Sequence, residues 1–285
     1  MTISWACEVI VVTSLGDFKM IAIDQRNRDI FRQGANLFFS IAQFFVTFLP
    51  AFGIGIGIGD RATGDSSSIG PIYWAFFIWF LIFPACIAYG IYQAFPSQRE
   101  NEILLSIGFH TASAFIGVTA YALVAQFGGS DWILIAIFVW ILASLLSAFF
   151  RLTDYERHLT KRERYLILVP ISLLTGWVSL AILVNLASAL KISGIIQSGT
   201  VETVFSVVLL LIALLIASFI IHKSKGNPWY AFPVIWGLMG VVVANVWERP
   251  DYVVAITSGF VALAILGILL RVRRREKELH GEDRS

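Results

Sequence analysis

Residues 203–221, TVFSVVLLLIALLIASFII, form an apolar run without a charged side chain. A helix of this length crosses roughly 30 Å of hydrocarbon. Seven further runs are similar in length and composition, and none alternates polar and apolar residues as a barrel strand does. In lipid such segments must satisfy their backbone hydrogen bonds internally, so each is predicted to be a helix. The predicted spans are residues 36–59, 71–95, 103–127, 132–150, 165–190, 203–221, 228–246 and 252–270.

The composition supports the same class. The chain has 285 residues, of which 58% are hydrophobic and 14% charged, and its mean hydropathy is +0.79. These values lie outside the usual range of soluble domains. We therefore predict an all-α integral membrane protein with eight transmembrane helices, in contact with the lipid bilayer.

The basic residues indicate the orientation of the chain. With alternate connections assigned to one side, Arg61, Lys191 and Arg249 fall on one side and the other 18 of the 21 Lys and Arg residues on the opposite side. Cytoplasmic connections carry an excess of Lys and Arg. This predicts that both termini are cytoplasmic.

The alternating glycines Gly53, Gly55, Gly57 and Gly59 end the first predicted span. They have two interpretations. Glycines four residues apart let a neighbouring helix approach closely, whereas a run of glycines also weakens and ends a helix.

Residues 1–15 are mildly apolar, but Glu8 interrupts them and no basic segment precedes them. We expect no signal peptide there, and residues 1–19 are interpreted as a non-native or misassigned extension. Cys7 and Cys86 are too few and too far apart for a disulfide framework or a thiolate metal site.

The predicted spans contain no Asp, Glu, Lys or Arg, which disfavours proton-coupled transport through the bundle. Hydrolase, zinc-protease and nucleotide-binding motifs are absent, so no catalytic or metal-binding residue is predicted and an enzyme is disfavoured. His110 has two interpretations, a one-sided haem ligand or a histidine satisfied at the membrane interface.

Aromatic side chains are the remaining candidates for a binding site. Trp79, Trp140, Trp177 and Trp236 lie deep in predicted spans, whereas other tryptophans fall near the interfaces, where an aromatic belt is expected. Deep tryptophans that face a bundle interior can wall a pocket for a flat hydrophobic ligand, or only pack.

Three segments carry a family resemblance. The segment 71–83, PIYWAFFIWFLIF, resembles the second-helix motif of larger proteins related to the tryptophan-rich sensory (TspO/MBR, translocator protein) family. The segments 91–99, IYQAFPSQR, and 177–185, WVSLAILVN, are also similar to family motifs. These matches lie mainly in spans two to five.

The resemblance implies a five-helix core, residues 36–190, with an added three-helix module, residues 191–270. Residues 1–35 and 271–285 would be cytoplasmic. It also implies a pocket for a tetrapyrrole or a sterol-like molecule, with no obligatory cofactor. Its ligand-binding residues, carried over by motif, would be Trp79, Phe83, Trp177, Ala181 and Asn185.

The chain departs from the family pattern at three positions. Val118 and Tyr121 occupy third-span positions where relatives carry Asn and Trp, and Tyr73 replaces a glycine before the second helix. The lost amide removes one polar member of the implied pocket.

The leading hypothesis is a membrane-embedded binding or sensory protein for a porphyrin-like or other flat lipophilic ligand. A transporter or lipid-handling protein is an alternative, motivated by Pro84, Pro170 and Pro233, which could interrupt helices. Further alternatives are a structural membrane component without a ligand and a porphyrin-degrading enzyme. A homo-oligomer is compatible with each, and a nucleic-acid partner is not expected.

Overall fold

The computed structural model describes residues 15–57, 67–155 and 159–282. Within these ranges the regular structure is entirely helical and contains eight long segments, which confirms the predicted all-α, eight-helix fold. The segments are α1 (Leu15–Thr47), η2 with α3 (Tyr73–Ile78, Trp79–Ala94), α4 (Glu102–Gln126), α5 (Asp131–Tyr155), α6 with η5 and α7 (Lys161–Glu163, Arg164–Leu168, Val169–Ile192), α8 (Thr200–Lys223), α9 with η6 (Pro228–Val243, Ala244–Glu248) and α10 (Tyr252–Glu282). Two short 3-10 turns are η1 (Leu49–Phe52) and η3 (Pro96–Gln98).

Among the described helices, seven are long and apolar enough to cross a membrane. The eighth, α1, is less apolar because polar side chains alternate with its phenylalanines. Arg32, Gln33, Asn36, Ser40 and Gln43 all lie buried on its inner face. Since α4 and α3 cover this face, the polar groups avoid lipid.

The boundaries predicted for the first span, residues 36–59, were wrong. Helix α1 begins at Leu15 and ends at Thr47, and η1 follows it. Gly53 and Gly55 then adopt left-handed φ angles of 78°, a conformation that costs glycine little. Gly53 therefore caps η1, and the described glycines up to Gly57 lie outside a helix, so the interpretation that they form a helix-packing face is wrong for these residues.

Local sequence signals set several of the other boundaries. The side chain of Asn101 accepts hydrogen bonds from the first amides of α4, and Asn227 does the same for α9. Thr160 and Glu163 form a reciprocal capping box at α6. The expected interruptions at Pro84 and Pro233 are not found, because α3 and α9 continue through them.

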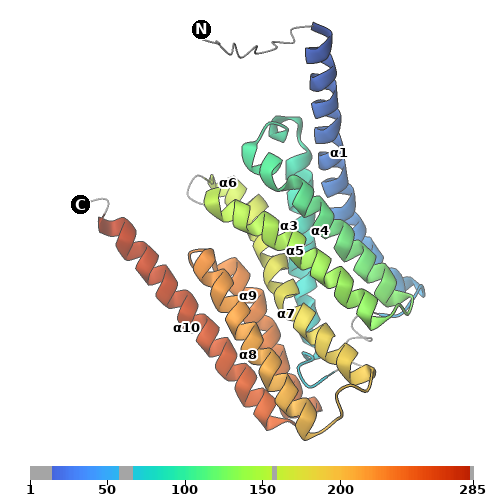
Figure 1. Cartoon of the computed structure of the whole chain (residues 1–285), viewed down its shortest axis with the longest axis vertical. Helices are drawn as coiled ribbons and strands as arrows, with labels where there is room; N and C mark the ends of the chain where they lie inside the picture. Colours follow the sequence, from blue (N-terminus) through green and yellow to red (C-terminus); the bar gives the residue numbers. More distant parts are fainter. Residues whose placement is uncertain (1–14, 58–66, 156–158, 283–285) are drawn as a thin grey trace, which may run out of the picture.

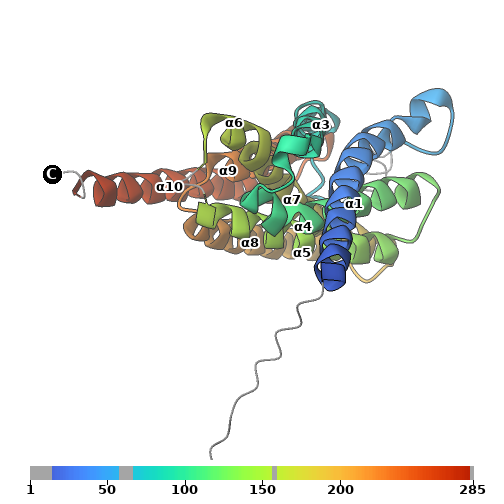
Figure 2. The same ribbon diagram turned by 90° about the horizontal axis from the view of Figure 1, so that it is seen from above.

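Helix α7 is the centre of the bundle, and all of its residues from Val169 to Leu180 are buried. It contacts α5 and α3 on one side and α8 and α9 on the other. Figure 1 shows α8, α9 and α10 grouped on one side of α7, with α1 on the far side. In Figure 2 the ends of α1 and α10 project beyond the bundle in different directions.

Candidate ligand-binding site

An aromatic cavity of about 250 Å³ lies where α1 ends, between the start of α3, α4 and α5. The predicted residues Trp79 and Phe83 line it. Their rings are stacked, with centroids 4.6 Å apart and planes at 20°. The lining residues are Thr47, Phe48, Pro50, Ala51, Gly57, Tyr73, Phe76, Phe77, Trp79, Phe80, Phe83, Val118, Tyr121, Ala122, Phe138, Ile141 and Val178.

A smaller cavity of about 50 Å³ lies behind the first, against α7. The other three predicted residues, Trp177, Ala181 and Asn185, line this cavity. They are four residues apart and so lie on one face of α7. The structure thus brings all five residues predicted by motif to two adjacent cavities, with Trp79 lining both.

The partition between the cavities is made of side chains that line both: Phe76, Trp79, Tyr121 and Phe138. The Trp177 ring lies edge-on to Phe76 at 5.9 Å and to Trp79 at 6.1 Å. Such edge-to-face pairs each contribute about 0.5–1.5 kcal/mol beyond area burial. The partition is therefore a packed aromatic unit, and its displacement would join the two cavities.

Polar contacts at the partition come from Tyr121 and Asn185. The Tyr121 hydroxyl donates to Asn185 Oδ1 over 3.1 Å, and Asn185 Nδ2 donates to the Ala181 carbonyl over 2.8 Å. Tyr121 was noted in the sequence as a departure from the family pattern, and the structure gives it a place in the site. Of the described residues that line the two cavities, none is Asp, Glu, Lys, Arg or His.

The larger cavity reaches the outer surface of the bundle through the start of α3. Tyr73, Phe77 and Phe80 line it while remaining 51%, 54% and 62% exposed. Because such rings in a membrane helix face lipid, this side of the cavity is a mouth toward the bilayer.

His110 lies on α4 and lines neither of these cavities. The structure does not bring it together with the five aromatic-site residues.

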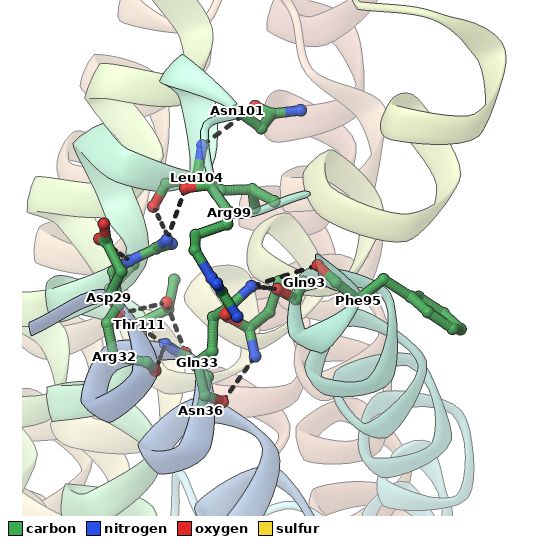
Figure 3. A network of polar contacts seen from close by, with 11 residues as sticks. Asp29, Arg32, Gln33, Asn36, Gln93, Phe95, Arg99, Asn101, Leu104 and Thr111 are labelled. Carbon is green, nitrogen blue, oxygen red and sulfur yellow. Dashed lines mark hydrogen bonds and ion pairs between the residues drawn. The ribbon is translucent and has the colours of Figure 1, made fainter. Parts of the chain in front are cut away.

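A buried polar network that sequence analysis missed joins α1 to α3 and α4 (Figure 3). Fully buried Arg32 donates to the Leu104 carbonyl over 2.9 Å and to the Arg99 carbonyl over 3.2 Å, and it lies 3.5 Å from Asp29. Deeper along α1, Asn36 donates to Gly108 O over 2.7 Å and accepts from Thr111 over 2.7 Å.

A second pair of contacts lies beside Arg32. The side-chain amide of Gln33 donates to the backbone carbonyl of Gln93 over 2.7 Å, and the side-chain amide of Gln93 donates to the backbone carbonyl of Gln33 over 2.8 Å. This reciprocal pair fixes the register of α1 against α3. Arg32 lies about 22 Å and Asn36 about 16 Å along α1 from Thr47 at the cavity, so the network supports the fold rather than the site.

The architecture and the cavities define a multi-pass α-helical membrane protein with an aromatic internal site. Residues 33–271 match the model of the family described as TSPO-like protein. This match covers well over half of the chain, so the protein belongs to the TSPO-like protein family, and the resemblance is confirmed. Neither the curated proteins nor the solved structures gave a significant match. The division into a core, residues 36–190, and an added module, residues 191–270, stays a prediction.

Proposed function

We propose that this chain is a membrane-embedded binding or sensory protein that holds a flat lipophilic ligand of the porphyrin type. The observation that carries the proposal is the pair of adjacent aromatic-lined cavities around Trp79, because aromatic side chains in a largely apolar pocket favour a flat hydrophobic ligand. The family membership supports it. The proposed mechanism is binding without turnover.

The size of the site constrains how such a ligand binds. Pockets for drug-sized ligands usually enclose about 300–1,000 Å³, and the larger cavity encloses about 250 Å³. A tetrapyrrole therefore needs either displacement of the Trp79 partition, which joins the smaller cavity, or exposure of one ring edge at the Tyr73 and Phe77 mouth. A sterol-like molecule faces the same constraint.

The described lining residues suit contact with the hydrophobic porphyrin ring rather than with a bound metal ion or with the carboxylates of the porphyrin. Among the described residues that line the two cavities there is no His, Cys or Met, so none of them would ligate the iron of haem. The same described lining holds no cation, so we expect the porphyrin carboxylates to lie at the mouth, in contact with lipid head groups and water. We expect metal-free protoporphyrin and haem to bind with similar affinity, and a porphyrin without carboxylates to bind at least as tightly.

The test is a titration of detergent-purified protein with protoporphyrin and haem, followed by tryptophan emission and by ligand absorbance. We compare the wild type with Trp79→Phe and Trp177→Phe, and with Trp140→Phe as the matched control. The control is suitable because Trp140 lines neither cavity. Saturable binding at low micromolar ligand, weakened by the first two substitutions and unchanged by the third, supports the proposal.

Non-saturating quenching that is identical in all four proteins would refute it. That result would favour the transporter or structural alternatives, which uptake by proteoliposomes then separates. We also infer from the distribution of basic residues that both termini are cytoplasmic.

A further inference from the structure

The segment 67–75 runs from the outer loop into the wall of the larger cavity, and it packs against α8, α9 and η6. Within it Ser67, Ile69 and Ala75 are 2%, 1% and 0% exposed. The residues that follow directly, Phe76 and Trp79, line both cavities. A displacement of this segment would therefore move the aromatic partition.

The outer half of the segment is held by side chains of η6, the residue after it, and α8. Asn245 Nδ2 donates to Ser68 O over 2.7 Å, and Arg249 donates to Ser67 O over 3.2 Å and to Gly70 O over 2.8 Å. From α8, Glu202 Oε1 accepts from the Ser68 amide over 2.8 Å and from its hydroxyl over 3.0 Å. Lys191 lies 3.0 Å from the same carboxylate oxygen.

The inner half of the segment is held by α9. The Ile72 amide donates to Gly240 O over 3.1 Å, and Trp236 Nε1 donates to Ala75 O over 2.8 Å. A Cβ atom at Gly240 would lie only 2.7 Å from Ala75 Cβ, so glycine is needed for this close approach. The Trp236 ring also packs edge-on against Trp74, with centroids 5.0 Å apart.

The hydrogen bonds have a common geometry: each joins a backbone group or the Ser68 hydroxyl of the segment to α8, α9, η6 or Arg249, and the described residues of these elements do not line the larger cavity. We propose that α9 and η6 act as a clamp that positions the wall of the ligand site, with Trp236 and Arg249 as its positioning residues. This inference rests on the proposed function. It makes α9 and η6, together with Glu202 of α8, a determinant of how tightly the site holds its ligand.

The test uses the full chain with Trp236→Phe and Arg249→Lys. The first keeps an aromatic ring and removes one donor, and the second keeps the charge but loses the fork that reaches two carbonyls. Trp140→Phe is the matched control, because it also removes one indole hydrogen bond, from Trp140 to Ser113, but far from the segment in sequence. Hydrogen–deuterium exchange of residues 67–75 is measured in detergent, together with the dissociation rate of bound protoporphyrin.

We expect exchange in the segment to become about 5-fold faster in the first two variants, the factor that corresponds to one lost hydrogen bond. Exchange in the control should match the wild type, and protoporphyrin should dissociate faster from the two clamp variants alone. Unchanged exchange in both variants, or an equal rise in Trp140→Phe, overturns the clamp. Faster exchange without faster dissociation overturns its role in positioning the wall.

A wild-type protein that binds no protoporphyrin would instead count against the proposed function. The exchange result would then still decide whether α9 holds the segment, so the two failures are distinguishable.

Discussion

Gly176 on α7 lies close to the backbone of α9, and its substitution gives a sharp test of the packing. A Cβ atom at this position would fall inside contact distance of the Tyr230 carbonyl oxygen and 2.7 Å from Cγ of Pro233. A carbon atom normally approaches a carbonyl oxygen no closer than about 3.3 Å. The obstructing oxygen belongs to the backbone of α9, so it cannot move aside by a rotamer change.

Gly176→Ala must therefore separate the two helices. Overpacking of this kind costs about 1–3 kcal/mol, from which up to about 1 kcal/mol of improved helix propensity is subtracted. Gly267→Ala on α10 is the matched control, because its Cβ atom would meet nothing within 4 Å. The same chemical change should therefore leave stability unchanged or raise it slightly.

The assay is thermal unfolding of the purified variants in one detergent, followed by circular dichroism. We expect Gly176→Ala to lower Tm by about 2–4 °C for each kcal/mol lost, and Gly267→Ala to match or exceed the wild type. A Gly176→Ala protein that melts at the wild-type temperature, or an equal loss in the control, would refute the close approach of α7 and α9.

Two further predictions concern polar contacts. Tyr121→Phe removes the hydroxyl that donates to Asn185 Oδ1. We therefore expect a loss of about 1 kcal/mol in unfolding free energy and an altered porphyrin affinity. Unchanged melting and binding would show that the contact is not formed. Arg32→Ala removes a fully buried guanidinium and its bonds to two carbonyls, so we expect a loss of about 2–4 kcal/mol. Arg28→Ala, at an exposed position, should stay within about 0.5 kcal/mol by the same thermal assay.

The number and type of the helices could be predicted because lipid imposes a length and an apolar composition on each span. The boundaries of the first span could not. The predicted span began after Arg32 and Gln33 because charged and strongly polar residues indicate the end of a hydrophobic segment, whereas the structure buries both on the inner face of α1. At the other end, the apolar residues after Thr47 extended the prediction beyond the helix. The signal was present, since Gln33, Asn36, Ser40 and Gln43 recur at helical spacing within an apolar run.

The candidate site was partly predictable. Trp79 with Phe83, and Trp177 with Ala181 and Asn185, follow helical spacing, so each set was expected to share a face. Their meeting across α3 and α7 depended on the family resemblance. Phe76 and Phe138 were not predicted to form the partition, because apolar residues in a membrane helix give no sequence signal that separates lipid contact from contact with another helix.

The polar residues of α1 help to explain how this helix is held beside the larger cavity. An arginine and four polar side chains on one helix face would be costly in hydrocarbon, so α1 gains its stability from the partners on α3 and α4. Those contacts lie at the end of α1 away from the cavity. Near the cavity, α1 is held by aromatic packing, such as Phe44 with Phe83 at 6.0 Å, and by one hydrogen bond, in which the Gln126 side-chain amide donates to Val46 O over 2.8 Å. The buried network therefore supplies most of the polar contacts that hold α1, whereas aromatic rings supply most of its packing beside the ligand site.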